Sequence, residues 1–237
     1  MNNDGLLTYM NKSRHLIFLA MLYIVILILS AVFFYRYIDF DHIALPGGMF
    51  VYPILYVITD IVTELYGYST ARLFIWYGIF CNFIFGIIAF FLTYTPTISG
   101  TEFAHDYNAI FREILRLDAG NFVGQLLGSF INIYMISKWK ILVKGRFFFV
   151  RSVTSNLFGE FVMLTVTGTI VLAGRLPMHE IFALLAADYV IRILFCFIFS
   201  TPAAFFVSYI KNKEKIDVYD LSTKFNPFRL SITNGIY

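Results

Sequence analysis

Long, nearly uninterrupted apolar runs constrain this chain more than any other feature of its sequence. The first runs from Leu16 to Tyr35 and contains almost no polar side chains. A helix needs roughly 20 apolar residues to cross the hydrocarbon core of a bilayer, at about 1.5 Å per residue. Because lipid offers the backbone no hydrogen-bond partners, such runs must be helical. The sequence therefore predicts an all-α fold, a polytopic bundle of transmembrane helices.

About six such spans follow one another along the chain. We expect them at Leu16–Tyr35, Ile43–Leu65, Leu73–Tyr94, Ile114–Ile136, Val150–Ala173 and Ile181–Ile210. Together they form one membrane domain over residues 16–210, between a polar segment at 1–15 and a polar tail at 211–237. The first run is too long for a signal-peptide core and no small-residue cleavage site closes it, so it should remain as an anchor. The tail is expected to be mobile, and the long connection Thr95–Glu113 to end in a short interfacial helix.

The basic residues indicate how the bundle is oriented. Thirteen of them fall in the segments that would be inside if the amino terminus is inside, and four fall in the opposite loops. Lys and Arg are enriched in cytoplasmic loops of membrane proteins. Both termini are therefore predicted to be cytoplasmic.

Composition excludes several classes of protein. Hydrophobic residues make up 59% of the chain and charged residues 14%, whereas soluble domains have about 45–50% and about 25%. A net charge of +3 argues against nucleic-acid binding, which needs a dense basic face. Cys81 and Cys196 lie inside apolar runs and are expected to be packing residues. The four histidines lie in loops or at span ends, so we expect no metal, no cofactor and no catalytic dyad: His15, His42, His105 and His179.

The second span carries two acids on one helix face. Asp60 and Glu64 are four residues apart, and Tyr56 lies one turn earlier on the same face. A charge at the bilayer centre costs roughly 2.5–3.5 kcal/mol on insertion scales, so such residues are functional candidates. The alternative is that Glu64 lies at the inner interface and only Asp60 is buried.

The fourth span carries a polar stripe at helical spacing: Asp118, Asn121, Gln125, Ser129 and Asn132. A neighbouring face carries glycines at four-residue spacing, which let another helix approach closely: Gly120, Gly124 and Gly128. The stripe could line a wet cavity or form hydrogen bonds between helices, and its length favours the cavity.

The fifth and sixth spans repeat this pattern. Ser152, Ser155, Asn156, Gly159 and Thr167 lie on one side of the fifth span, and Glu160 borders them at a depth that requires a partner. In the sixth span Asp188 and Arg192 are four residues apart. They could be an intrahelical ion pair that offsets its own desolvation, or a pair that orients a carboxylate toward a substrate.

One segment adds a family resemblance. Residues Tyr52 to Arg72, YPILYVITDIVTELYGYSTAR, resemble the signature of the queuosine precursor transporter family, also called the VUT family: a Pro, then Thr-Asp, an aromatic-Gly pair and Ala-Arg. Gly124-Gln125, Arg151 to Gly159, and Asp188-Tyr189 with Arg192 match further positions, so the resemblance covers about residues 50–212. The chain departs from the pattern at Gly128 and Met163, where members often carry an acid, and at Glu160, where an amide is common.

The resemblance implies a six-span importer in the bacterial inner membrane. Its substrates would be deazaguanine precursors of a modified tRNA nucleoside: 7-cyano-7-deazaguanine, 7-aminomethyl-7-deazaguanine or queuine. A carboxylate can accept their ring N–H and exocyclic amine together, a role we expect for Asp60, while amides read the remaining edge. The candidate substrate-binding residues are Tyr56, Asp60, Glu64, Asn121, Gln125, Asn156, Glu160, Asp188 and Arg192. The expected partners are this substrate, the lipid bilayer and, in a homo-oligomer, further copies of the chain.

Other functions remain open from the residues alone. The chain could be the substrate-binding membrane subunit of an ATP-driven importer, since it has no Walker motif of its own, or a transporter of another small planar polar solute. A membrane enzyme would need a nucleophile and a base within reach of each other, and the sequence offers no such pair. A purely structural bundle would not need polar residues on three spans.

Overall fold

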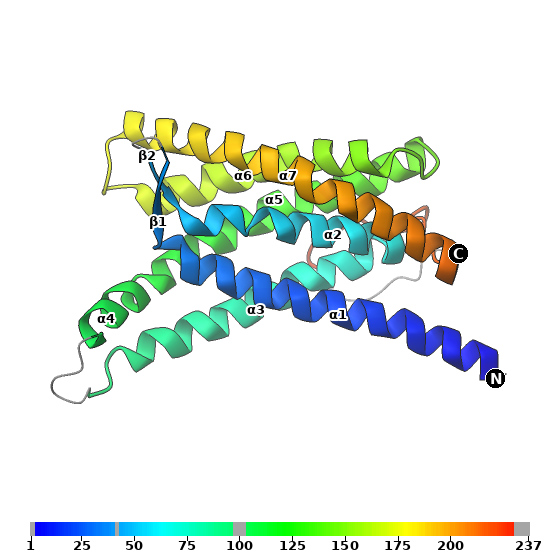
Figure 1. Ribbon diagram of the computed structural model, residues 1–237, viewed down its shortest axis with the longest axis horizontal. Coiled ribbons are helices and arrows are strands. Elements are labelled where there is room, and N and C mark those ends of the chain that lie inside the picture. The colour runs from blue at the N-terminus through cyan, green and yellow to red at the C-terminus, as the bar shows by residue number, and fades with distance from the viewer. Residues whose placement is uncertain (1–2, 41–42, 97–102, 230–237) are drawn as a thin grey trace.

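The protein is an elongated bundle of helices that lie side by side (Figure 1). The computed structural model describes residues 3–40, 43–96 and 103–229, with the side chains of 14–39, 45–96 and 103–229. The start of α1 and the end of α7 lie together at one end, which we call the termini end. A β-hairpin and the short helix α4 lie at the opposite end, which we call the hairpin end.

Six long or membrane-deep helices make up the bundle: α1 (Asn3–Phe34), α2 (Pro53–Tyr66), α3 (Tyr68–Leu92), α5 (Ile114–Leu142), α6 (Phe148–Leu172) and α7 (Met178–Glu214). The shorter elements are the strands β1 (Tyr37–Phe40) and β2 (Ile43–Pro46), a 3₁₀ turn η1 (Gly47–Phe50), and α4 (Ala104–Arg112). The strands pair antiparallel. The helix α4 has no buried residue and confirms the short helix expected before Glu113.

Five described segments are long and apolar enough to cross a membrane: Arg14–Phe34, Gly47–Tyr66, Tyr68–Leu92, Phe148–Leu172 and Met178–Glu214. The helix α5 is not among them, although its 29 residues would span roughly 43 Å at 1.5 Å per residue. Its polar stripe lowers its hydropathy, and it packs extensively against α6 and α3 inside the bundle. The predicted all-α membrane bundle is confirmed, and the chain is a multi-pass membrane protein.

The second predicted span begins too early. Ile43–Pro46 is a strand, and the helix starts only at Pro53, because Pro has no N–H to lose at a helix start. The 3₁₀ turn between them passes close to α1: a Cβ on Gly48 would lie 2.4 Å from the Ser30 carbonyl oxygen. The apolar pattern does not reveal this close approach, which requires glycine.

The connection from α2 to α3 is a single residue, Gly67, whose φ of +85° is readily available only to glycine. The prediction of a loop up to Arg72 is therefore wrong, and Arg72 is a fully buried residue of α3. Lys140, also expected in a loop, is a buried helix residue as well, and so is Arg151 at the start of the fifth span.

The tail after α7 packs against the termini end, so the expectation that it is mobile is wrong for the part described. Trp76 Nε1 donates to the Pro227 carbonyl oxygen at 2.7 Å, and the backbone N–H of Tyr68 donates to Asp220 Oδ2 at 2.9 Å. Ile216 and Val218 are buried in the same core as α2 and α3. The tail supplies enough apolar and polar contacts to order itself.

The glycine face of α5 packs against α6, as predicted. A Cβ on Gly124 would lie 2.8 Å from the Met163 carbonyl oxygen, and one on Gly128 would lie 2.5 Å from the Gly159 carbonyl oxygen. The two backbones are therefore in direct contact. This contact holds the polar residues of α5 and α6 at a fixed depth relative to each other.

Candidate functional site

The candidate site is a column of buried polar residues along one face of α2. Tyr52, Tyr56, Asp60 and Glu64 follow at steps of four residues and are all buried. Each step rises about 6 Å along a helix axis, so the column leads from a cavity near the hairpin end to a charged cluster at the termini end. Residues of α5, α6 and α7 complete it at three levels.

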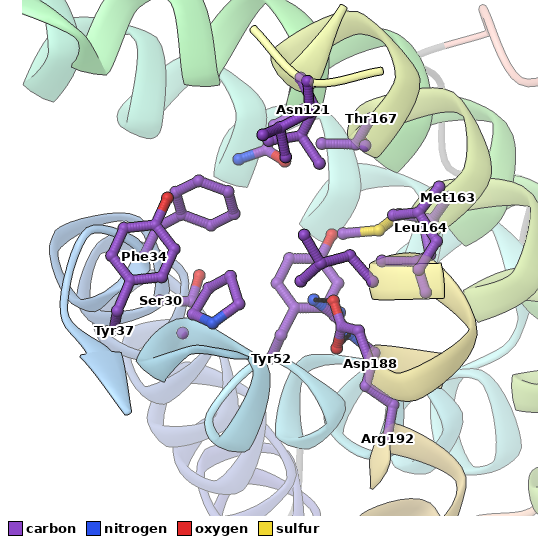
Figure 2. Close-up of a pocket in the computed structure, with 17 residues that line it drawn as sticks. Ser30, Phe34, Tyr37, Tyr52, Asn121, Met163, Leu164, Thr167, Asp188 and Arg192 are labelled. Atoms are coloured by element: carbon purple, nitrogen blue, oxygen red, sulfur yellow. Dashed lines mark hydrogen bonds and ion pairs between the residues drawn. The ribbon is translucent and has the colours of Figure 1, made fainter. Parts of the chain in front are cut away.

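At the first level lies a cavity of about 100 Å³. Figure 2 shows Asp188 and Arg192 of α7 together beside Tyr52, with Asn121 of α5 across the cavity. The hairpin residues Tyr37 and Pro46 form part of the wall, which places the cavity toward the hairpin end. The other lining residues are mainly apolar: Ser30, Phe34, Gly48, Met163, Leu164, Thr167, Gly168, Leu172, Leu176, Leu184 and Leu185.

Arg192 joins two carboxylates at this cavity. Its Nε lies 2.6 Å from Asp188 Oδ1 and its Nη2 lies 3.2 Å from Asp188 Oδ2, while its Nη1 lies 3.1 Å from Glu160 Oε2. The guanidinium also lies 5.0 Å from the centre of the Tyr52 ring. Asp188 and Arg192 line the cavity, whereas Glu160 lies behind Arg192 and does not. With two acids and one cation, the group carries an excess negative charge.

At the second level Asp60 is held by neutral groups. Its Oδ1 accepts from Asn132 Nδ2 at 2.8 Å, and its Oδ2 accepts from Ser152 Oγ at 2.5 Å. Nearby polar groups are only loosely paired: Asn156 faces Asp60 and the Tyr56 hydroxyl faces Ser129, but neither contact has standard hydrogen-bond geometry among the described residues. Because buried polar atoms are nearly always paired in stable proteins, this level has hydrogen-bonding capacity to spare.

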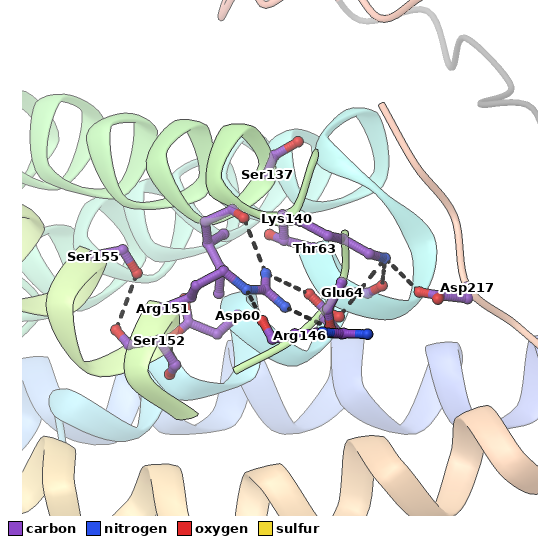
Figure 3. A network of polar contacts seen from close by, with 12 residues as sticks. Asp60, Thr63, Glu64, Ser137, Lys140, Arg146, Arg151, Ser152, Ser155 and Asp217 are labelled. Carbon is purple, nitrogen blue, oxygen red and sulfur yellow. Dashed lines mark hydrogen bonds and ion pairs between the residues drawn. The ribbon is translucent and has the colours of Figure 1, made fainter. Parts of the chain in front are cut away.

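At the third level Glu64 is the centre of a charged cluster (Figure 3). Glu64 Oε2 lies 2.9 Å from Arg151 Nη1, and Glu64 Oε1 lies 2.5 Å from Lys211 Nζ and 3.8 Å from Lys140 Nζ. Asp217 of the tail closes the cluster, 2.6 Å from Lys140 Nζ and 2.8 Å from Lys211 Nζ. We call these five residues the Glu64 cluster.

The Glu64 cluster ties five parts of the chain together at the termini end. Its members come from α2, α5, α6, α7 and the tail. Burial alone would raise the pKa of Asp217, but the ammonium groups of Lys140 and Lys211 outweigh it and lower that pKa below its usual value. Asp217 therefore stays ionised, and the cluster keeps the termini end closed in this structure.

The structure does not bring all nine predicted residues to one place. Asn121, Asp188 and Arg192 line the cavity, and Glu160 supports it from behind. Tyr56, Asp60 and Asn156 lie at the second level, and Glu64 lies at the third. Gln125 donates to the Tyr23 hydroxyl of α1 at 3.1 Å and lines a smaller recess beside α3.

The polar stripe of α5 serves helix contacts more than a cavity. Asp118 accepts from Asn82 of α3 at 2.6 Å, Gln125 contacts α1 and Asn132 contacts α2. Only Asn121 lines the main cavity. Asp118, Asn121 and Gln125 also line the smaller recess beside α3, so the stripe meets cavities as well as neighbouring helices, and the expected wet cavity stays a prediction.

Two departures from the resembled family pattern lie against each other. A Cβ on Gly128 of α5 would lie 2.6 Å from the Cβ of Met163 on α6. The acids expected at these positions would face one another, so their joint absence is structurally consistent. Sequence reasoning missed the partners of Glu64: Lys140 was expected in a loop, Lys211 in the tail, and Arg151 at the start of the fifth span without a partner. The two residues that hold Asp60, Asn132 and Ser152, lie on the predicted polar faces.

A comparison with known families identifies one match. The model of a family described as "putative vitamin uptake transporter" matches residues 46–207. No curated protein and no solved structure matches the chain. The matched residues include all three levels of the column on α2, α5 and α6, and the cavity residues of α7. The tail with Asp217 lies beyond them.

Proposed function

Because the chain belongs to the vitamin uptake transporter family, we propose that it imports deazaguanine precursors of queuosine across the bacterial inner membrane. Such a substrate is small, planar and polar. Its pyrimidine edge presents two adjacent N–H donors beside one carbonyl oxygen. A site for it must offer acceptors and a donor side by side, next to a flat apolar or aromatic surface.

The observation that carries this proposal is the Asp188–Arg192 pair at the cavity wall. A carboxylate can accept two parallel N–H bonds, and a guanidinium can donate to a carbonyl oxygen. Their proximity, with Nε 2.6 Å from Oδ1, matches the donor and acceptor order of the deazaguanine edge. The binding role therefore moves from Asp60, which does not line the cavity, to Asp188.

Further residues of the cavity suit the rest of such a ligand. Tyr52 offers an aromatic face beside Arg192, where a planar ring can stack. Asn121 and Thr167 lie where they can bond the pyrrole N–H or the 7-substituent, and leucines supply apolar walls. Glu160 holds Arg192 from behind at 3.1 Å and keeps the guanidinium in place when Asp188 turns to the substrate.

The proposed orientation in the membrane rests on the charge distribution. The termini end holds the described basic residues of the Glu64 cluster and the loop with Lys144 and Arg146. By the positive-inside rule this end faces the cytoplasm, and the cavity opens toward the outside. A cavity near the outer end and a closed inner end correspond to a state that receives substrate from outside.

The test is uptake in cells that lack both their own precursor synthesis and their own importer. Cells expressing the protein are given labelled 7-cyano-7-deazaguanine, 7-aminomethyl-7-deazaguanine or queuine, and queuosine in their tRNA is scored. We expect at least one of the three to restore the modification. If none enters at any concentration while the protein is present in the membrane, the substrate assignment is wrong.

A further inference from the structure

Asp60 is one of two buried acids of the described helices that have no cation beside them. Five acids are buried in the described helices: Asp60, Glu64, Asp118, Glu160 and Asp188. Glu64, Glu160 and Asp188 each form ion pairs with Lys or Arg. No described cation lies within ion-pair distance of Asp60 or Asp118. Asp60 is the more deeply buried of the two, with no exposed surface.

The nearest cation is already committed elsewhere. Arg151 donates from Nη1 to Glu64 and to the Ile136 carbonyl oxygen, and from Nε and Nη2 to the carbonyl oxygens of Arg146 and Gly145. All its nitrogen atoms are occupied. An isolated carboxylate in a dry, low-dielectric interior becomes neutral by taking up a cation or a proton.

The geometry at Asp60 fits a proton rather than a metal ion. The 2.5 Å separation of Asp60 Oδ2 and Ser152 Oγ is the length of a strong O–H···O bond and leaves no room for a metal ion between the two oxygens. The described residues contain no group of three or more His, Cys, Asp or Glu side chains that could hold a metal. One proton lies between the two oxygens in either state of Asp60: Ser152 donates it when Asp60 is ionised, and Asp60 donates it when Asp60 is protonated.

A chain of hydroxyl groups continues from Asp60. Ser152 Oγ of α6 lies 3.2 Å from Ser200 Oγ of α7, and either can be the donor. When Asp60 is ionised, Ser152 donates to it and Ser200 can donate to Ser152. When Asp60 carries a proton, it donates to Ser152, which then donates to Ser200. Both states keep the Asp60–Ser152 and Ser152–Ser200 contacts as hydrogen bonds, so Asp60 can gain or lose one proton in place.

We propose that Asp60 is the proton-carrying site of this transporter, so that each substrate enters together with a proton. This inference rests on the proposed uptake function. A proton from the outside converts the Asp60 carboxylate to a neutral acid. The acid then releases this proton to the cytoplasmic side. Hydrogen bonds to a carboxylate are roughly twice as strong as neutral ones. Protonation therefore weakens the bonds to Asn132 and Ser152 that hold α2 against α5 and α6.

The position of Asp60 couples this change to both neighbouring levels. One turn toward the cavity is Tyr56, and one turn toward the termini end is Glu64. Among the charged and titratable groups of the other helices, Arg151 of α6 and Cys196 of α7 interact electrostatically with Asp60, and Glu160 and Arg192 act in turn on Cys196. The helices α5 and α6 also present the neutral Asn132 and Asn156. Release of α2 at this level would let the cavity and the Glu64 cluster open in turn.

The first experiment measures uptake of the labelled deazaguanine into proteoliposomes with an imposed proton gradient. We expect an acidic exterior to accelerate uptake by the unsubstituted protein and an uncoupler to abolish the acceleration. Asp60→Asn imitates the protonated acid, because its Nδ2 can donate to Ser152, so the acceleration should be lost. Asp60→Glu restores an acid and should restore part of it.

Asp118→Asn is the matched control, since Asp118 is the other buried acid with only a neutral partner, Asn82. It should keep the response to the gradient. The proposal is overturned if Asp118→Asn loses the response and Asp60→Asn keeps it, if a sodium gradient drives uptake instead, or if uptake ignores the proton gradient. An Asp60→Asn protein with higher KM and an intact gradient response would mark Asp60 as a substrate ligand instead.

A second experiment needs no substrate and so separates this inference from the proposed function. Infrared difference spectra of the purified protein in lipid are recorded across a pH series. In the unsubstituted protein and in Asp118→Asn, the carbonyl band of protonated Asp60 should appear as the pH falls. In Asp60→Asn this contribution to the band should be absent. Identical spectra of the unsubstituted protein and Asp60→Asn at every pH would overturn the inference even if uptake is confirmed.

Discussion

At the scale of single residues, the charges of this bundle are distributed unequally over three levels. At the cavity, Arg192 forms ion pairs with two acids, whereas at the termini end three cations surround the single acid Glu64. The excess negative charge therefore lies at the cavity, where N–H donors of a substrate can use it. The excess positive charge lies at the end that faces the cytoplasm in our orientation.

Asp188→Asn tests the binding role at the cavity. The substitution preserves size but removes the charge and directs one N–H toward the donors of the substrate. Loss of a charged hydrogen bond costs about 1.5–3 kcal/mol, which corresponds to a roughly ten- to hundredfold rise in KM for uptake. The control is Asp106→Asn in the exposed helix α4, with membrane protein levels matched. An unchanged KM in Asp188→Asn would remove Asp188 from the site.

Glu64→Gln tests the role of the Glu64 cluster in stability. Without this acid, Lys140 and Lys211 keep only Asp217 as an anionic partner, and Arg151 keeps none among the described residues. Removing one partner of a buried ion pair costs about 3–5 kcal/mol, so thermal unfolding of the detergent-solubilised protein should begin at a clearly lower temperature. Glu180→Gln, at an exposed site, should leave the unfolding temperature unchanged. Equal unfolding temperatures for both variants would mean that the cluster contributes no net stability.

At the scale of elements, the sequence predicts which residues share a helix face but not which helix they meet. The periodicity of α5 correctly separates a glycine face from a polar face. It cannot tell that Asp118 meets α3, Gln125 meets α1 and Asn132 meets α2, because those partners depend on how helices distant in sequence pack. For the same reason Glu64 could be recognised as a buried acid, while Lys140 and Lys211, expected in a loop and in the tail, could not be recognised as its partners.

Helix ends are predicted less well than helix interiors, and the reason is local. Apolar residues such as Ile43 and Leu45 extend a hydrophobic run whether they form a strand or a helix. The break at Gly47-Gly48 is set by the approach of α1, which leaves no room for a Cβ on Gly48. The single-residue connection at Gly67 depends on the tail residues Val218 and Asp220, which pack against it.

Gly124→Leu tests the contact between α5 and α6. A Cβ here would lie 2.1 Å from Thr167 Oγ1 and 2.8 Å from the Met163 carbonyl oxygen, so a leucine must push the two helices apart. Overpacking of this kind typically costs about 1–3 kcal/mol, and we expect a lower yield of folded protein by size-exclusion chromatography. Val123→Leu, on the exposed side of the same helix turn, is the control. Full yield and full uptake in Gly124→Leu would show that the glycines are not a contact face.

At the scale of the whole molecule, the two ends of the bundle differ in charge and in closure. The hairpin end carries the cavity, and the termini end carries the Glu64 cluster and the packed tail. The connections from α1 to α2 and from α3 to α5, at the hairpin end, are long, whereas those from α2 to α3 and from α5 to α6, at the termini end, are short. A transporter needs such an asymmetry to present its site to one side of the membrane at a time.

Reporter fusions test the orientation. Fusions after Lys144 and after Arg229 should report a cytoplasmic location, because both follow segments at the basic termini end. Fusions after Tyr94 and after Leu176 should report the opposite side, because α3 and α6 end at the hairpin end. Alkaline phosphatase and green fluorescent protein give opposite signals and serve as each other's controls. A cytoplasmic signal after Tyr94 would contradict the proposed topology.

The tail residue Asp217 also has a consequence for biogenesis. A chain is synthesised from its amino terminus and its parts fold largely in that order, so Asp217 is made after every helix that it joins. Until then three cations, Lys140, Arg151 and Lys211, share the single carboxylate of Glu64. Burying cations without an anionic partner is costly, so we expect this end of the bundle to close fully only once the tail has packed, as the last step of assembly.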